Sequence, residues 1–326
     1  DLLRATPGAV VSMEGGADTI FVPTFTNPFM IQKRDGGFTY DTTDLAALRY
    51  RFTNDRVQRI IYVTDVSQEP HFMMLFAAGQ DAGYYDPATQ RCDHVGFGLV
   101  FGPDGKKLST RAGETIKLAD LLDEAPKRSY EESCRREEDR RQLAEEKGDT
   151  YEGLTEEELR ANAQVIGYGA VKYFDLRNNR TSSYRFSYDE MLSLKGNTAV
   201  GLIYAYVRMR SIARKAGIAD AQDVQSALEA AHPEGLTVTL NSESEWALGV
   251  QLMRFATTVD EMTETLAPNK MTDFLYQLVE SFNTFYQKEN ILNAEDRDSK
   301  LLLCEATATV LKEGLRLLGI GVLEKL

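Results

Sequence analysis

The sequence predicts an α/β domain with a parallel sheet, followed by an all-α helical bundle. Two apolar runs, 59–64, which is rich in β-branched residues, and 95–101, flank a segment with helical spacing at 70–83. Strand, helix and strand in this order are the unit of a parallel sheet. From about residue 196 onward, apolar residues recur with the helical period instead. With 326 residues, the chain is long enough for two domains.

Local patterns predict the elements of the first part. The run 59–64 is almost continuously apolar, so we expect a strand that is buried on both faces. The run 95–101 is predicted to be a second strand, which ends at a Pro-Asp-Gly turn. A Gly-Gly turn at 36–37 leads into a predicted helix that carries Tyr40 and Asp44 on one face.

The rest of the chain is predicted to be helical. Residues 116–165 are very polar, and the alternation of Glu and Arg at 130–147 favours a solvent-exposed helix over a partner-binding segment. Four segments with apolar periodicity then form the predicted bundle: 196–217, 243–266, 271–289 and 300–318.

Composition narrows the class of protein. The 37 basic and 50 acidic residues give a net charge of −13. No apolar run reaches the roughly 18–20 residues that a membrane span needs, so we expect no membrane partner. Three widely spaced cysteines (Cys92, Cys134 and Cys304) argue against a disulfide framework and favour a reducing, cytoplasmic compartment. The sequence contains no His-x-x-x-His pair or Cys-x-x-Cys motif, so we expect no metal site.

The charge is unevenly distributed along the chain. Residues 172–215 hold nine basic and three acidic side chains, a net charge of +6, together with seven aromatic residues. This mixture suits phosphate contacts and stacking on unpaired bases, although a solvated basic face over core aromatics explains the same pattern. Because arginine is almost never buried without a partner, we expect two exposed stripes on the predicted helix, one with Tyr206, Arg210 and Arg214 and one with Tyr204 and Arg208.

Three polar clusters in the first part of the chain have residues suited to chemistry, at 36–47, 64–68 and 104–113. The first is equally explained as the capped start of a helix. The second follows a strand, where open α/β sheets bind ligands, and an ordinary loop is the alternative. The third is a Gly-bracketed loop with cations and hydroxyls that suit a polyphosphate.

The order of these clusters is more specific than any one of them. In sequence order, the chain resembles the catalytic domain of arginyl-tRNA synthetases at 38–46, 62–72, 94–98 and 105–113. Further segments at 169–173, 178–181 and 196–199 resemble the same family. The resemblance implies three parts: the second half of a Rossmann-like catalytic domain at 1–122, a connecting region that contacts the tRNA stem at 123–195, and an all-α anticodon-binding domain at 196–326.

The resemblance implies an arginine-binding site at Tyr40, Asp44 and Gln68. A carboxylate accepts two parallel hydrogen bonds from a guanidinium, which the ammonium of lysine cannot reproduce. The resemblance also implies tRNA contacts along the basic stretch, at Arg185, Lys195, Asn197, Tyr204, Arg208, Arg210 and Arg214.

The same resemblance implies an ATP site. In it, His94, Val95 and Gly96 lie against the adenine, and ATP enters as a substrate with Mg²⁺ rather than as a tightly bound cofactor. Residues 107–111 occupy the place of the Lys-Met-Ser-Lys-Ser loop of class I synthetases, but a threonine replaces the second lysine. The expected catalytic residues, which stabilise the departing pyrophosphate, are Lys106, Lys107 and Ser109, and Lys107 also binds ATP.

One motif of the family is missing. Class I synthetases carry a His-Ile-Gly-His-like motif early in the catalytic domain, and none occurs in this sequence. Since the chain begins at Asp1 and the resemblance begins in mid-domain, we expect an N-terminally truncated chain that is inactive alone. The intact protein is expected to join L-arginine to tRNA(Arg) with ATP. The alternatives are a non-catalytic tRNA-binding module of the same family and an unrelated α/β nucleotide-binding enzyme.

Overall fold

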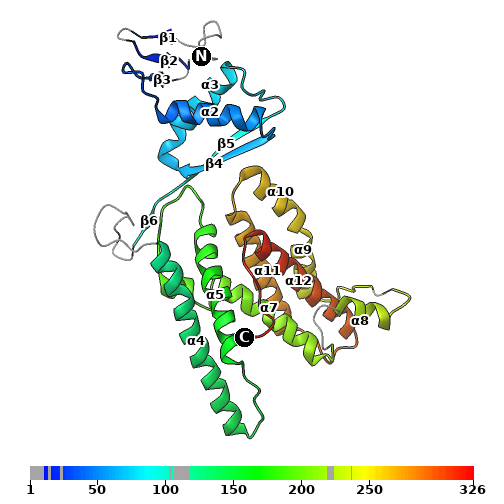
Figure 1. The fold of residues 1–326 in the computed structure, drawn as a ribbon. Helices are drawn as coiled ribbons and strands as arrows, with labels where there is room; N and C mark the ends of the chain where they lie inside the picture. Colours follow the sequence, from blue (N-terminus) through cyan, green and yellow to red (C-terminus); the bar gives the residue numbers. More distant parts are fainter. Residues whose placement is uncertain are drawn as a thin grey trace. The chain divides into compact units, whose positions relative to one another are not determined.

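The structure is a computed structural model that describes residues 11–13, 16–22, 25–102, 105, 118–218, 224–235 and 237–326. The chain forms two compact units (Figure 1). The first unit comprises residues 1–99 with 181–183, and the second comprises 100–180 with 184–326.

The first unit contains the predicted α/β part. An antiparallel sheet is formed by β1 (Val11–Ser12), β2 (Asp18–Ile20) and β3 (Phe29–Gln32). The chain continues through α2 (Tyr40–Thr53), β4 (Arg59–Asp65), the short 3-10 helix η1 (Val66–Gln68), α3 (Glu69–Asp81) and β5 (Arg91–Phe97). The strands β4 and β5 pair in parallel, and α3 connects them. This confirms the predicted strand–helix–strand unit.

Two details of the predicted strands are wrong. The second strand spans Arg91–Phe97 rather than 95–101, because its first half is polar: Asp93 on β5 forms ion pairs with Arg59 and Arg91 at 2.7 and 2.9 Å. The pair Val100–Phe101 instead forms β6, which pairs in parallel with β7 (Tyr184–Arg185) in the second unit.

The strand β4 is buried on one face only. Tyr62 of β4 and His94 of β5 pack against Phe72 of α3, with ring centroids 4.8 and 4.9 Å apart. On the opposite face, Ile61 is 44% and Val63 is 62% exposed. The expectation of burial on both faces is wrong because only two strands and one covering helix layer form this sheet in the described residues.

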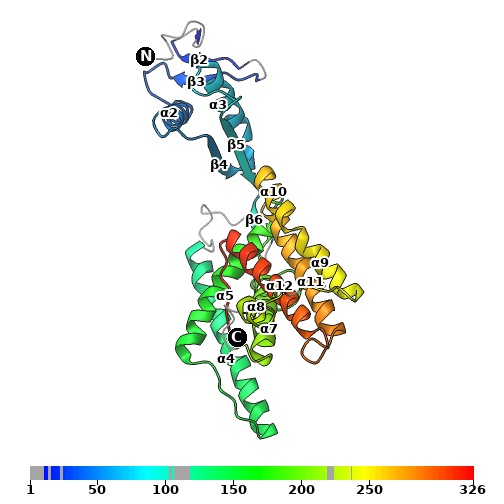
Figure 2. The same cartoon turned by 90° about the vertical axis from the view of Figure 1, so that its right-hand side faces the viewer.

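The second unit is helical. Its helices are α4 (Leu118–Lys147), α5 (Glu156–Leu176), α6 (Tyr188–Met191), α7 (Ala199–Lys215), α8 (Val224–Ala231), α9 (Glu243–Met253), α10 (Phe255–Thr265), α11 (Asn269–Lys288) and α12 (Arg297–Leu317). The helices α9, α11 and α12 lie side by side in both ribbon views (Figure 2). Their core contains side chains with no exposed surface, among them Leu275, Leu278, Phe282, Leu311 and Leu315. This confirms the predicted all-α part.

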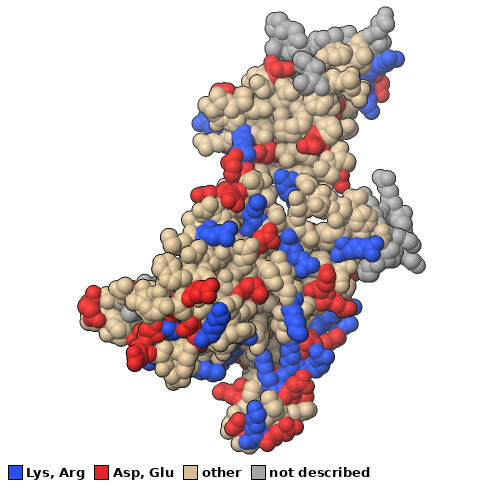
Figure 3. Space-filling view, turned by 180° about the vertical axis from the view of Figure 1, so that it is seen from behind, with Lys and Arg blue, Asp and Glu red and all other residues tan. Residues whose placement is uncertain are grey.

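The helices α4 and α5 pack closely against each other (Figure 1). A β-carbon at Gly167 of α5 would lie 2.5 Å from the nitrogen of Pro126 in α4, so glycine permits this approach. In the segment 130–147, the predicted i,i+4 pairing is present at Glu132–Arg136, at 2.7 Å, and Glu124–Arg128 forms a further such pair before that segment, also at 2.7 Å. Figure 3 shows acidic and basic side chains mixed on the lower part of the helical unit. This confirms the expected charged helix.

Two parts of the predicted bundle differ in the structure. The segment 243–266 forms two helices that meet at Arg254 rather than one. The one-residue break leaves the apolar periodicity intact, so the sequence pattern does not show it. The helix α8 was not predicted, since its buried apolar anchors are only Val224 and Leu228. None of the helices within the described ranges is long and apolar enough to cross a membrane.

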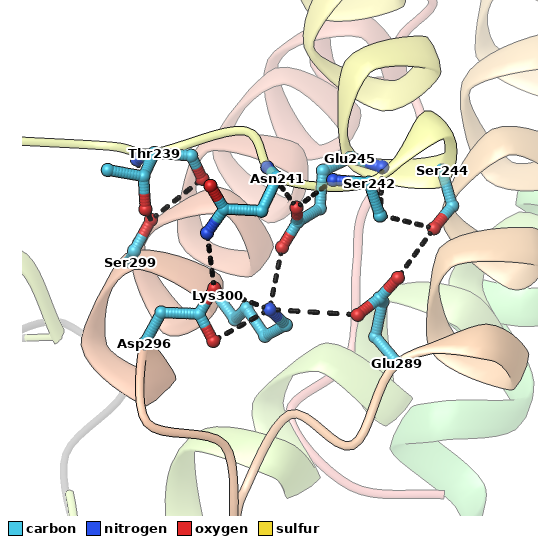
Figure 4. A network of polar contacts seen from close by, with 9 residues as sticks. All are labelled: Thr239, Asn241, Ser242, Ser244, Glu245, Glu289, Asp296, Ser299 and Lys300. Carbon is cyan, nitrogen blue, oxygen red and sulfur yellow. Dashed lines mark hydrogen bonds and ion pairs between the residues drawn. The ribbon is translucent and has the colours of Figure 1, made fainter.

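A buried ion network joins three elements of the bundle (Figure 4). The ammonium of Lys300 on α12 lies 2.7 Å from Glu245 of α9 and 2.7 Å from Asp296. Glu289, which follows α11, lies 3.6 Å away and accepts a hydrogen bond from the Ser244 hydroxyl. Lys300 is 6% and Glu245 is 1% exposed, so this network fixes the end of α11 and the start of α9 to α12.

Candidate functional site

Hydrogen bonds to β3 fix the start of α2, which carries Tyr40 and Asp44. The Thr39 hydroxyl donates to the carbonyl of Met30 at 2.9 Å, and the Thr42 hydroxyl donates to the carbonyl of Ile31. The amide of Met30 donates to Asp41 at 3.2 Å. Because these bonds join two elements, the side chains on the first turns of α2 have a defined position.

His71 of α3 lies between two carboxylates of α2. Its Nε2 is 2.8 Å from Oδ2 of Asp44, and its Nδ1 is 3.2 Å from Oδ1 of Asp41. The ring of Tyr40 packs edge-on against the imidazole, with centroids 4.9 Å apart. The structure therefore brings together two of the three predicted arginine-site residues, Tyr40 and Asp44, around a histidine.

Burial changes the chemistry of this cluster. It raises the pKa of the Asp41 carboxyl, and the hydrogen bond from Met30 and the nearby His71 oppose that rise. Asp44 is more open, with a side chain that is 38% exposed. A cation from solvent can therefore reach Asp44 more easily than Asp41.

The third predicted arginine-site residue, Gln68, lies at the end of β4. Asp65 caps η1, since its Oδ1 accepts hydrogen bonds from the amide and hydroxyl of Ser67 at 2.9 and 2.6 Å. Gln68 ends η1, is exposed, and precedes His71 by three residues along the continuing helix. It lies at the carboxyl end of a parallel strand, where α/β sheets bind ligands.

The predicted adenine-contacting residues lie on β5. His94 contacts the Thr64 hydroxyl at 2.8 Å and stacks on Phe72. Val95 is half-buried and pairs with Val63. Gly96 is buried, and a β-carbon there would meet the backbone of Val66 at 3.0 Å, so the glycine permits a close contact within the protein itself.

The predicted catalytic residues Lys106, Lys107 and Ser109 lie outside the described residues. The residue before them, Gly105, is described, and a β-carbon at Gly105 would lie 3.2 Å from Nη2 of Arg185. The guanidinium of Arg185 therefore lies beside the start of this basic loop.

The predicted tRNA-binding residues have different environments. Arg185 and Lys195 are exposed. Asn197 is half-buried, and its side-chain oxygen accepts a hydrogen bond from the buried Tyr173 hydroxyl at 2.5 Å. Its side chain therefore has an internal structural partner.

Arg208 occupies a second polar site in the helical unit. Its guanidinium lies 5.2 Å from the ring centroids of both Tyr204 and Tyr286, and it donates to Asn283 at 3.2 Å. A cavity of about 310 Å³ adjoins it, which Lys215, Asn290 and Asn293 also line. The carboxylate of Glu289 also lines this cavity, so its wall carries two cations, one anion, amides and an aromatic ring, a polar lining that can contact RNA.

The exposed stripe predicted for α7 is wrong at Tyr206 and Arg210. Both side chains are 3% exposed, and Arg210 forms an ion pair with Glu305 of α12 at 2.5 Å. The third member, Arg214, is half-buried and donates to the carbonyl of Glu324. Packing of α12 against α7 covers this face, and a carboxylate on α12 provides the partner that the sequence of α7 alone does not show.

Two side chains at these sites could not be assigned to them from the sequence. His71 contacts both Asp41 and Asp44, and Tyr286 completes the stack on Arg208. The signal for His71 was its place one helical turn after Gln68. No local signal pointed to Tyr286, which lies far from Arg208 in the sequence.

Comparisons with known proteins agree on one family. Residues 4–188 match the family described as tRNA synthetases class I (R), catalytic domain, and residues 202–326 match the DALR anticodon binding domain. The chain is 48% identical over 319 residues to an arginine–tRNA ligase of a Synechococcus strain, covering 95% of this chain and 51% of the relative. It is 43% identical over 320 residues to the chloroplastic/mitochondrial arginine–tRNA ligase of Arabidopsis thaliana, covering 97% of this chain and 47% of the relative.

Solved structures give the same result. The arginyl-tRNA synthetase of Plasmodium falciparum matches all of this chain and 51% of its own, with a TM-score of 0.81 and 31% identity. The Thermus thermophilus arginyl-tRNA synthetase matches all of this chain and 57% of its own, with a TM-score of 0.77 and 22% identity, which supports the fold. The chain spans about half the length of the curated relatives that it matches.

Proposed function

The chain belongs to the arginine family of class I tRNA synthetases, and we propose on this basis that it serves the ligation of L-arginine to tRNA(Arg). The observation that carries this proposal is the succession, in one chain, of a synthetase catalytic domain and an anticodon-binding domain. Because the chain spans about half of its relatives, we assign the complete reaction to the full-length protein.

The reaction has two steps. The carboxylate of arginine attacks the α-phosphate of ATP, which forms arginyl-adenylate and releases pyrophosphate. A hydroxyl of the terminal tRNA ribose then attacks the arginyl carbonyl and releases AMP. Catalysis of this kind depends on positioning and charge stabilisation, and needs no protein nucleophile.

We assign arginine binding to Tyr40, Asp44 and Gln68. Three observations support this assignment. Asp44 has a partly exposed carboxylate that contacts His71, and the ring of Tyr40 packs against the same imidazole. Gln68 lies at the end of η1, one helical turn before His71. In this assignment Asp44 accepts hydrogen bonds from the guanidinium, and Gln68 fixes its orientation. A site left with an unpaired carboxylate rejects side chains without a guanidinium.

We assign the adenine of ATP to His94, Val95 and Gly96, and the leaving pyrophosphate to Lys106, Lys107 and Ser109. Mg²⁺ enters with the phosphates of ATP, whose charge it neutralises. Within the described ranges, no three ligating side chains gather into a metal site, so we assign no residue of this chain to the ion.

We assign tRNA binding to the helical unit, through Arg185, Lys195, Tyr204 and Arg208. The support is the exposure of the first two side chains and the cavity beside Arg208. Arg210 is left out, because its guanidinium is buried against Glu305. A cytoplasmic location is also part of the proposal. The free thiols of Cys92, Cys134 and Cys304 agree with a reducing compartment, and cell fractionation tests it.

A competition experiment on this chain tests the proposal. Labelled tRNA(Arg) is bound to the purified chain and displaced by unlabelled tRNA(Arg) or by a tRNA for another amino acid. We expect tRNA(Arg) to be the better competitor, with an affinity that falls steeply with salt. Equal displacement by every tRNA would contradict the proposal.

A further inference from the structure

We propose that His71 is a positioning residue of the arginine site, which holds the Asp44 carboxylate in the orientation that accepts a guanidinium. This inference rests on the proposed function. It adds a residue that contacts no substrate itself and acts through Asp44.

Both nitrogens of His71 face α2. Nε2 lies 2.8 Å from Oδ2 of Asp44, and Nδ1 lies 3.2 Å from Oδ1 of Asp41. The other oxygen of Asp44, Oδ1, has no hydrogen-bond partner within the described ranges. One oxygen of Asp44 is therefore fixed by the protein, and the other is available to a ligand.

Aromatic rings fix the imidazole in turn. Phe29 of β3 stacks on it at 6.0 Å, and Phe72 of α3 and Tyr40 of α2 pack edge-on at 5.0 and 4.9 Å. The side chain of His71 is 13% exposed. Since three elements enclose the ring, it is a rigid support for the more exposed Asp44.

The two carboxylates make the cluster acidic, which suits a cationic ligand. Nε2 of His71 hydrogen-bonds Oδ2 of Asp44, whereas Nδ1, although 3.2 Å from Oδ1 of Asp41, has no hydrogen-bond partner in the described residues. Burial raises the pKa of the Asp41 carboxyl, and Asp44 is the more exposed of the two carboxylates. Asp44 is therefore the carboxylate that a guanidinium can reach more easily.

Other charged and titratable groups near the cluster do not replace His71. The Tyr62 hydroxyl of β4 has a raised pKa through burial, and the nearby Arg51 guanidinium lies 5.5 Å from its ring. His94 of β5 contacts the Thr64 hydroxyl and stacks on the ring of Phe72. Among the described side chains, only the imidazole of His71 contacts both Asp41 and Asp44.

The test uses the full-length protein and arginine-dependent ATP–pyrophosphate exchange with tRNA present. His71→Leu removes both polar contacts, and His71→Asn is a polar variant too short to reach Asp44. We expect each to raise the KM for arginine about 10-fold or more, by the strength of a hydrogen bond to a charged group. The kcat and the KM for ATP should change by less than about threefold.

Two further variants separate positioning from folding. His71→Gln can still donate a hydrogen bond toward Asp44, and it should restore most of the arginine affinity. His232→Gln is the matched control, because His232 also lies between two carboxylates, 2.8 Å from Asp298 and 3.5 Å from Glu234, in the helical unit. It should leave the KM for arginine unchanged. Thermal unfolding of all four variants monitors the fold.

The outcomes are distinguishable. An unchanged KM for arginine in His71→Asn overturns the inference, even if His71→Leu fails to fold. The inference is also overturned if kcat falls and the KM for ATP rises by the same factor as the KM for arginine, since a general structural defect then explains the effect. If the unmodified protein shows no arginine-dependent exchange, the proposed function itself is refuted, and the inference with it.

Discussion

Arg208 and Arg210 stand two positions apart on α7 and have opposite environments. Arg208 lies between two tyrosine rings and beside a cavity, whereas Arg210 is buried against Glu305. A side chain two positions further along a helix lies on another face, so nearby basic positions in the sequence have different environments. The density of arginines alone is therefore a poor guide to RNA contacts.

We predict different effects for the two alanine variants. Arg210→Ala should lower the free energy of unfolding by about 3–5 kcal/mol, because it leaves Glu305 without its partner. Arg208→Ala should cost little stability and should reduce the slope of log K for tRNA against log salt by about one unit or slightly less. Urea unfolding and salt-dependent tRNA binding measure the two effects. The reverse pattern would place Arg210, rather than Arg208, at the RNA.

The Asp44 carboxylate gives a prediction about amino-acid binding. Asp44→Asn keeps the shape of the side chain but removes its charge. In the full-length protein it should weaken arginine binding by about 1.5–3 kcal/mol, the strength of hydrogen bonds to charged groups. The readout is the KM for arginine in pyrophosphate exchange, which should rise roughly 10- to 100-fold. An unchanged KM would remove Asp44 from the arginine site.

At the scale of elements, Lys300 determines how α9, α11 and α12 are held together (Figure 4). Lys300→Met leaves Glu245, which is almost fully buried, without its cation. Such a loss typically costs about 3–5 kcal/mol. Urea unfolding monitored by circular dichroism measures it. A stability change below about 1 kcal/mol would show that the network is dispensable.

The same network makes the stability of the helical unit depend on pH. Hydrogen bonds from Ser242 and Ser244 and the Lys300 charge lower the pKa of Glu289, and the Lys300 hydrogen bond lowers that of Asp296. Carboxyls with a lowered folded pKa stabilise above their unfolded pKa, and this contribution is lost as pH falls through the folded value. We therefore expect the urea concentration at the unfolding midpoint to decrease as the pH is lowered below about 4. In Lys300→Met this decrease should be smaller. Parallel pH curves for both proteins would contradict this.

Elements with long, regular patterns could be predicted from the sequence, and their contacts could not. The strand–helix–strand unit and the helices α7, α11 and α12 follow from apolar periodicity within each segment. The polar start of β5 escaped prediction because its partner, Arg59, lies 34 residues away from Asp93. The burial of Arg210 escaped it because Glu305 is on another helix. At the candidate site, the shared helix face of Tyr40 and Asp44 could be predicted from their spacing, but the histidine between the two carboxylates required the packing of α3 on α2.

At the scale of the whole molecule, one face of the β4–β5 sheet presents exposed apolar side chains toward the carboxyl ends of its strands. Ile61, Val63 and Phe97 are each more than two-fifths exposed on it. Apolar side chains that cluster on one sheet face are typically covered by another layer.

We expect this chain alone to form no arginyl-adenylate. Exchange assays on the purified chain, with tRNA(Arg) present and tRNA binding verified separately, measure this. Adenylate formation by the chain alone would show that its two units suffice for activation.

We propose that the protein to which these two units belong activates arginine. The most direct measurement is ATP–pyrophosphate exchange by the full-length protein, with tRNA(Arg) present and each of the twenty amino acids tested in turn. We expect exchange with arginine, little with lysine, because an ammonium cannot reproduce the paired guanidinium bonds, and none with the others. Exchange that depends on a different amino acid, or no exchange with arginine, would contradict the account.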